Sequence, residues 1–209
     1  MEVAVLNKEG KDTGRKIKLA PEVFQIEAKD HVIYLDVKQY LANQRQGTHK
    51  SKQRAEIVGS TKKIKKQKGT GGARAGDIKN PLFRGGGRVF GPEPRYYGFK
   101  LNKKVKTLAK KAVLSAQAKS KNLIVVEDLK LDLPKTKEFA ALINALNKEG
   151  KRVTIVLPEY DRNVYLSSRN IQKVKVLATS DINTYDLMNC GKLILSESSV
   201  GSIVNALSN

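Results

Sequence analysis

The chain has 209 residues, enough for one domain with a sizeable core or for one domain plus an extension. Its 40 lysines and arginines outnumber 20 aspartates and glutamates, and a net charge of +20 predicts a polyanionic partner, with nucleic acid before an anionic membrane. No apolar run is long enough to span a bilayer, the start lacks the apolar core of a secretory signal, and a single cysteine, Cys190, excludes an internal disulfide. These features predict a cytoplasmic protein that binds nucleic acid and does not enter a membrane.

The positive charge is concentrated in one segment. Residues 45–106 contain 18 lysines and arginines, three acids and 11 of the 16 glycines, a net charge of +15. The other 147 residues hold 22 bases and 17 acids, a net charge of +5. The sequence therefore predicts a globular part, residues 1–44 and 101–209, interrupted by an extended basic insertion at 45–100.

The N-terminal globular part begins with two predicted strands and a helix. Residues 3–7 and 15–19 are short segments typical of strands. Asp30 is a suitable cap for a helix that runs to about Asn43. The apolar positions of this helix that share one face are Ile33, Val37, Tyr40 and Leu41.

The insertion follows in the chain. No helical or strand periodicity persists from Arg45 to about Lys100, and sparse apolar residues with repelling charges favour a segment that is disordered until a partner orders it. Such a segment is expected to be cleaved by proteases in the free protein. A solvated basic linker without function is the alternative.

Three features of the insertion favour RNA as its partner. The cations are dispersed, glycines cluster at 69–72 and 85–87, and aromatic rings that can stack on unpaired bases lie between them. These rings belong to Phe83, Phe90, Tyr96, Tyr97 and Phe99. The residues expected to contact RNA are Arg45, His49, Lys50, Lys52, Arg54, Lys62, Lys63, Lys65, Lys66, Lys68, Arg74, Lys79, Arg84, Arg88 and Arg95, with Lys103 and Lys104 at the start of the next helix.

Helices and strands alternate after the insertion. Asn102 is expected to cap a helix, and Thr136 a second one at 137–148 that ends at Gly150. Strands are predicted at 123–126, 153–157, 173–177 and 193–195, and shorter helices from Asp161 and near 184–189. The expected buried helix positions are Val105, Leu108, Ala109, Ala112, Val113 and Ala116, then Phe139, Leu142, Ile143 and Leu146, and in a last helix Val200, Ile203, Val204 and Leu207.

This alternation predicts an α/β fold. Continuous apolar strands separated by helices are typical of a mostly parallel sheet flanked by helices on both faces, doubly wound and Rossmann-like. The insertion would leave this fold after its first helix.

No catalytic or cofactor-binding constellation is recognisable. His31 and His49 lie far apart with no partner at ligand spacing, so no metal site is predicted and His49 is assigned to a phosphate or base. The glycine clusters lack the pattern of a phosphate-binding loop, and Glu127 and Asp128 are interpreted as a polar pair at a strand end. We predict neither an enzyme nor a cofactor. The alternatives are an mRNA-binding repressor or antiterminator and an RNA-modifying enzyme on a doubly wound fold.

Three segments carry a resemblance to a known family: RQGTHKSKQRAEIVGS (45–60), QKGTGGARAGDIKNPLFRGGGRVFGP (67–92) and KLNKKVKTLAKKAVLSA (100–116). Along most of its length the chain resembles the bacterial L-four protein family of the large (50S) ribosomal subunit. That resemblance implies a structural α/β protein whose long loop enters large-subunit (23S-type) rRNA. The loop tip would help to line the exit tunnel of the nascent peptide, opposite the L-twenty-two protein, and some members repress their own operon by binding mRNA. The implied tunnel-facing residues are Gln67, Lys68, Gly69, Thr70 and Gly71.

The sequence departs from the family pattern at the loop tip. Residues 62–66 read KKIKK, where many relatives have a proline and a tryptophan near Ile64 and Lys65, and Gly72 stands where an arginine is common. The contacts of that tryptophan and that arginine are therefore not transferred to this chain. Lys65 and Lys66 instead add charge to the tip.

Overall fold

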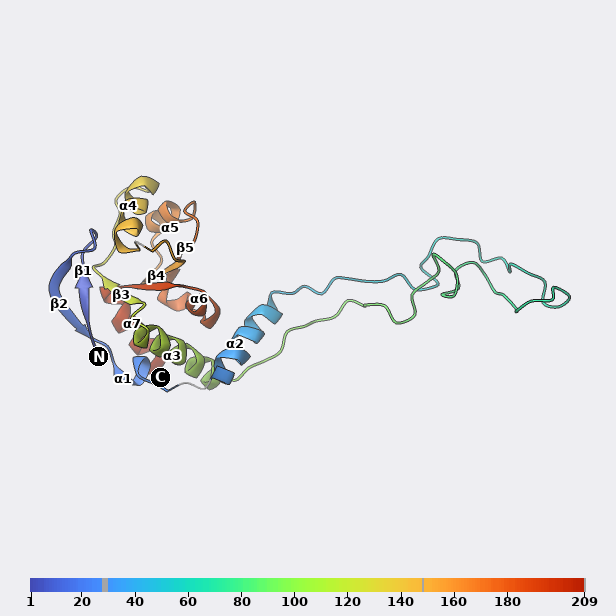
Figure 1. The fold of residues 1–209 in the computed structure, drawn as a ribbon, viewed down its shortest axis with the longest axis horizontal. Coiled ribbons are helices and arrows are strands. Elements are labelled where there is room, and N and C mark those ends of the chain that lie inside the picture. The colour runs from blue at the N-terminus through green and yellow to red at the C-terminus, as the bar shows by residue number, and fades with distance from the viewer. Residues whose placement is uncertain (28–29, 148, 209) are drawn as a thin grey trace. The chain divides into compact units, whose positions relative to one another are not determined.

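The computed structural model describes residues 1–27, 30–147 and 149–208. It divides into two compact units, which we call the body unit (Met1–Leu41 with Lys100–Asn209) and the loop unit (Ala42–Phe99). The elements in chain order are β1 Glu2–Leu6, β2 Asp12–Lys18, α1 Pro21–Phe24, α2 Asp30–Asn43, α3 Lys103–Lys119, β3 Leu123–Val126, α4 Thr136–Leu146, β4 Val153–Leu157, α5 Arg162–Ser168, β5 Val174–Ala178, the 3₁₀ turn η1 Thr179–Asp181, α6 Thr184–Met188, β6 Lys192–Ser196 and α7 Glu197–Ser208 (Figure 1).

The six strands of the described residues form one sheet in the order β2-β1-β3-β6-β4-β5. Only β1 and β2 pair antiparallel, and every other described pair is parallel. Next to the edge strand β5, Ile155 of β4 lies between Ile194 of β6 and Val176 of β5. The predicted α/β fold with a mostly parallel sheet is therefore confirmed.

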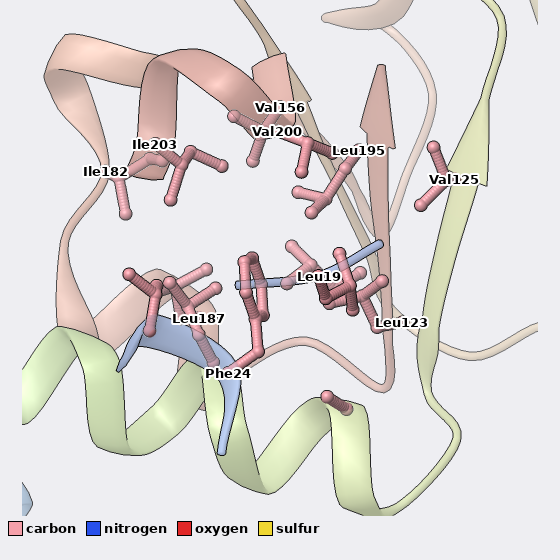
Figure 2. Packing of buried hydrophobic residues seen from close by; sticks show 14 of the residues in the cluster. Leu19, Phe24, Leu123, Val125, Val156, Ile182, Leu187, Leu195, Val200 and Ile203 are labelled. Atoms are coloured by element: carbon pink, nitrogen blue, oxygen red, sulfur yellow. The ribbon is translucent and has the colours of Figure 1, made fainter. Parts of the chain in front are cut away.

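Helices cover both faces of the sheet. Alternate residues of each strand point to opposite sides, and the apolar residues on each side pack against helices. Leu193 and Leu195 of β6 belong to a cluster formed with α1, α3, α6 and α7. Ile194, between them, belongs to a second cluster formed with α4 and α5. Figure 2 shows the first cluster, in which the ring of Phe24 points inward between Leu19 and Leu187.

Several local predictions are confirmed. The strands β3 and β4 have the predicted bounds, and the four apolar residues expected to be buried on α4 are buried. Asp161 caps α5, because its side chain accepts hydrogen bonds from the backbone N–H groups of Asn163 and Val164, at 2.8 and 3.4 Å. Glu127 and Asp128 form the polar strand end that was expected: Glu127 pairs with Arg15, and Asp128 accepts hydrogen bonds from Ser198.

The predicted apolar face of α2 is only partly buried: Ile33, Val37 and Tyr40 are half-buried, and Ile33 packs against the core. Leu41 is 43% exposed, and the buried residues of this helix are Asp36 and Gln39. Asp36 accepts a hydrogen bond from the hydroxyl of Thr184 on α6, and the ring of Tyr40 stacks on that of Tyr185 with 5.2 Å between centroids. The side of α2 that meets the rest of the body unit thus combines a polar contact of Asp36 with the predicted apolar positions Ile33 and Tyr40.

The predicted face of α3 is partly wrong. Leu108 is 42% exposed and Ala116 is exposed, whereas Leu114 and Ala118 are buried. The reason is that α3 is turned toward α1, and the Ser115 hydroxyl donates a hydrogen bond to the carbonyl of Val23.

Three smaller expectations need correction. Among the described residues, Asn102 precedes α3 without making a capping hydrogen bond, and Thr136 is the first residue of α4, with Lys135 at the cap position. The short helix α1 was not expected, so the loop unit follows the second helix and not the first. Lys148, the predicted end of α4, lies outside the described residues.

Candidate nucleic-acid interface

The loop unit carries the densest positive charge of the chain. Ala42–Phe99 contains 14 lysines and arginines and three acids, a net charge of +11. The body unit holds the remaining 26 bases and 17 acids, a net charge of +9 over more than twice the length. Lys103 and Lys104 lie in the body unit, exposed in the first turn of α3.

Residues 44–102, all of them described, contain no helix or strand. The loop unit instead consists of an outgoing and a returning stretch, which run alongside each other to a turn (Figure 1). Isolated backbone hydrogen bonds join the two stretches: Arg95 N to Gly47 O at 3.2 Å, Ser51 N to Pro92 O at 2.9 Å, Arg88 N to Lys52 O at 3.0 Å and Ile64 N to Gly76 O at 3.0 Å. Between these bonds, few backbone groups of this described segment are paired with the other stretch.

A cluster around Tyr97 joins the two ends of the loop unit. The guanidinium groups of Arg45 and Arg95 lie 3.8 and 4.4 Å from the centroid of the Tyr97 ring. The Tyr97 hydroxyl is 2.8 Å from Nε2 of His49. The centroids of the His49 and Tyr97 rings are 5.7 Å apart. A guanidinium stacked on a ring still presents its N–H edge to a phosphate. We call these four residues the Tyr97 cluster; in it Tyr97 orients two arginines rather than offering its ring to a base.

Gly47 is required by this cluster. Its φ of +68° is in the left-handed region, and a Cβ atom there would lie 2.1 Å from the backbone oxygen of Arg95 and 2.9 Å from the Tyr97 ring. No other residue type fits this position without moving the two chain ends apart.

The three acids of the loop unit are engaged inside it. Glu56 pairs with Lys50 and also accepts a hydrogen bond from the backbone N–H of Gln53. The hydrogen bond between Lys50 and Glu56 raises the pKa of the lysine and lowers the pKa of the carboxyl group. Glu93 accepts a bond of 2.8 Å from the Gln53 side chain. The acids therefore organise the chain and do not form an acidic surface that would repel RNA.

Asp77 is the most enclosed of these acids. Its side chain is only 12% exposed, and it pairs with Arg54 at 2.8 Å. The spacings of these acid–base contacts along the chain follow no local pattern, so sequence reasoning did not find them.

The tip of the loop unit is the turn closed by the Ile64–Gly76 hydrogen bond. All five residues assigned to the tip by resemblance are exposed, and the Gln67 side chain accepts a hydrogen bond from Lys63. Of the fifteen residues between Arg45 and Arg95 assigned to RNA, all are exposed except Lys79, which is half-buried. Phe90 and Tyr96, 99% and 79% exposed, are the rings most open to a base among these described aromatic residues.

The described residues show no group of three or more His, Cys, Asp or Glu side chains able to hold a metal ion. Cys190 is buried and donates to the carbonyl of Leu187 at 3.0 Å. No helix in the described part of the chain is long and apolar enough to cross a membrane.

Comparison with known proteins places these features in a family. Residues 17–206 match the sequence profile of the Ribosomal protein L4/L1 family. The chain belongs to this family. It is 58% identical to the large ribosomal subunit protein uL4 of Christiangramia forsetii over 208 residues, which covers all of both chains. The uL4 proteins of Flavobacterium johnsoniae (57%, all of both chains) and Cytophaga hutchinsonii (55%, covering 97% of this chain and 98% of the relative) are similar along the same length.

Membership of the L4/L1 family fixes the broad class of the protein. It is a ribosomal protein, and the family is structural rather than enzymatic. The match includes both units, so the loop unit is part of what the family shares.

Proposed function

We propose that this chain is a structural constituent of the large subunit of the cytoplasmic ribosome, and that its loop unit binds large-subunit (23S-type) rRNA. The observation that carries the proposal is that the loop unit, with a net charge of +11, uses all three of its acids in internal contacts and leaves every lysine and arginine except Lys79 exposed. Each cation that neutralises a phosphate releases a counterion, which offsets the conformational entropy lost when the loop is ordered.

Salt dependence of binding tests this proposal. A variant with the tip lysines Lys62, Lys63, Lys65, Lys66 and Lys68 changed to Gln is titrated with a large-subunit rRNA transcript at several salt concentrations. The slope of log affinity against log salt is expected to be smaller in magnitude by roughly 3.5 to 4.5, because each lost phosphate contact removes about 0.7 to 0.9. The intact chain, with about ten contacts, is expected to have a slope of roughly −7 to −9.

The matched control changes five exposed lysines of the body unit, Lys16, Lys18, Lys121, Lys130 and Lys137, to Gln. The two variants have the same net charge, so a general charge effect would lower both slopes equally. Equal slopes would contradict a binding role for the loop unit.

The turn at residues 64–76 is proposed to help line the nascent-peptide exit tunnel, near neighbouring large-subunit proteins that include the L-twenty-two protein. The support is the resemblance together with the exposure of Gln67, Lys68, Gly69, Thr70 and Gly71. A photoreactive group at Lys68, in particles carrying a stalled nascent chain, is expected to crosslink to that chain and to rRNA. Crosslinks to neither would reject the assignment.

A second role, repression of its own operon through mRNA, is favoured by the exposed rings of Phe90 and Tyr96, which suit unpaired bases in any folded RNA. Filter binding to the leader of its own mRNA tests this role. Affinity no greater than that for an unrelated RNA of equal length would reject it.

A further inference from the structure

The loop unit has an open cavity of about 800 Å³ on its surface, lined mostly by exposed residues. Its lining combines the basic residues Arg54, Lys79 and Arg88 with apolar surface from Ala55, Pro81 and Val89. Ligand pockets in proteins span roughly 300 to 1,000 Å³, so this cavity can hold one nucleotide-sized group.

Contacts within the loop unit fix the walls of this cavity relative to one another. Arg54 and Asp77, both in the lining, are tied by their 2.8 Å ion pair. Gly87 N donates to Lys79 O, and Arg88 N donates to Lys52 O, each at 3.0 Å. These bonds join the stretch at 52–55 to the stretches at 77–81 and 87–89, which are distant from it in sequence, and the cavity is formed where they meet.

Gly87 determines how closely two of these stretches approach. A Cβ atom on Gly87 would lie 2.5 Å from the backbone nitrogen of Arg54, closer than real Cβ contacts. The backbone that carries Arg54 and Ala55 is therefore positioned by the absence of a side chain at residue 87.

The lining favours a ligand that has both a negatively charged group and an apolar surface, because it combines basic with apolar residues. The single carboxylate, Asp77, is already paired with Arg54, which leaves Lys79 and Arg88 as uncompensated positive groups among these lining residues. A nucleotide of RNA has both required parts, a phosphate and a planar base. A nascent peptide is a poorer candidate for this cavity, because it carries a negative side chain only where it contains an aspartate or a glutamate.

We propose that this cavity receives one unstacked nucleotide of the bound RNA, with its base against Ala55, Pro81 and Val89 and its phosphate at Lys79 and Arg88. The proposal rests on the proposed function and adds a defined point of recognition to it. Single-stranded loops and bulges supply such extruded bases, and a fitted pocket gives the protein a fixed register on the RNA, which dispersed phosphate contacts do not.

The first test fills the cavity. Ala55→Trp places a large ring among the lining residues, and Val58→Trp, at a site 94% exposed and outside the lining, is its control. The full chain is bound to a protein-free large-subunit rRNA transcript, and the reactivity of every 2′-hydroxyl toward an acylating probe is measured. We expect one unpaired nucleotide to change reactivity with the native chain and with Val58→Trp, and to stay as in free RNA with Ala55→Trp.

The second test displaces one wall of the cavity, because a Cβ atom at residue 87 would push away the backbone of Arg54. Gly87→Ala is compared with Gly72→Ala, because neither glycine has a positive φ and a Cβ on Gly72 meets only ordinary contacts. Gly87→Ala is expected to lose the same single-nucleotide change and to bind the transcript roughly tenfold more weakly, in the range found when one stacked base is lost. Gly72→Ala is expected to match the native chain in both measurements.

The outcomes separate this inference from the proposed function. If the native chain leaves the whole transcript unchanged, RNA binding by the chain is rejected. If it gives a broad footprint that Ala55→Trp and Gly87→Ala both leave intact, the loop unit binds RNA but the cavity holds no nucleotide. Equal losses for each variant and its control would likewise overturn the cavity proposal, since the effect would not depend on the lining.

Discussion

At the scale of single residues, Tyr97 changes the interpretation of the loop aromatics. Phe90 and Tyr96 are open to bases, but the Tyr97 ring is in contact with two guanidinium groups from the two ends of the loop unit. A planar, oriented guanidinium offers paired N–H donors to a phosphate, which a flexible ammonium does not. The sequence shows that the loop contains arginines and aromatic rings, and the structure shows that Arg45 and Arg95 stack on Tyr97.

Replacing Arg45 by Lys tests the Tyr97 cluster. The charge is kept and the stacking on Tyr97 is lost, so affinity for the rRNA transcript is expected to fall about threefold, the value of an exposed cation–π contact. The salt slope should not change. Arg84→Lys is the control, because Arg84 is exposed and has no ring contact among the described residues. Equal effects of the two substitutions would contradict a special role for Arg45.

Cys190 gives a prediction about pH. Burial raises the pKa of its thiol to about 11, from an ordinary value of 9.0, so the folded chain keeps a proton that the unfolded chain loses. The contribution of this thiol to stability is complete below pH 9 and is lost as the pH rises toward 11. The free energy of unfolding in urea is therefore expected to fall more steeply over this range for the native chain than for Cys190→Ala. Parallel curves for the two proteins would show that the thiol does not titrate as inferred.

At the scale of elements, local patterns predict a strand or helix more reliably than they predict what it contacts. The bounds of β3 and β4 follow from short runs rich in β-branched apolar residues, which are typical of strands buried on both faces. On α2 the periodicity correctly indicated a helix, but polar contacts with α6 bury Asp36 rather than Leu41. Periodicity shows which residues share a face, and the neighbouring element decides which face is covered.

Helix caps supply a matched comparison of stability. Asp161→Ala removes the side chain that accepts two backbone hydrogen bonds at the start of α5, and is expected to lower the free energy of unfolding by about 1 kcal/mol. Asn102→Ala alters a cap position on α3 whose side chain makes no capping bond in the described structure, and is expected to cost far less. Urea denaturation of the full chain measures both, and equal losses would refute the capping role of Asp161.

At the scale of the whole molecule, the two units are expected to differ in resistance to proteolysis. Trypsin should cleave the free chain first between Lys62 and Arg74, where the lysines are exposed and one backbone hydrogen bond, from Ile64 to Gly76, joins the two stretches. The strands and helices of the body unit should survive as larger fragments. Addition of the rRNA transcript is expected to protect the loop unit. First cleavage within α3, or no protection by RNA, would count against the proposed division of roles.

The sequence by itself determined the broad answers. Net charge and its concentration in one segment predicted a polyanionic partner, the alternation of apolar periods predicted the α/β fold, and three ordered motifs identified the family. These properties are readable because they depend on composition or on neighbours a few residues apart.

Only the tertiary structure decided the strand order, the side on which α2 is buried, the joining of Arg45 and Arg95 through Tyr97, and the cavity beside Asp77. Each depends on residues brought together from distant parts of the chain. Such contacts are set by the path of the backbone and by close approaches such as that of Gly87 to Arg54, and no local pattern encodes them. The charge of the chain predicts the class of partner, whereas the proposed contact sites depend on how distant parts of the backbone are brought together.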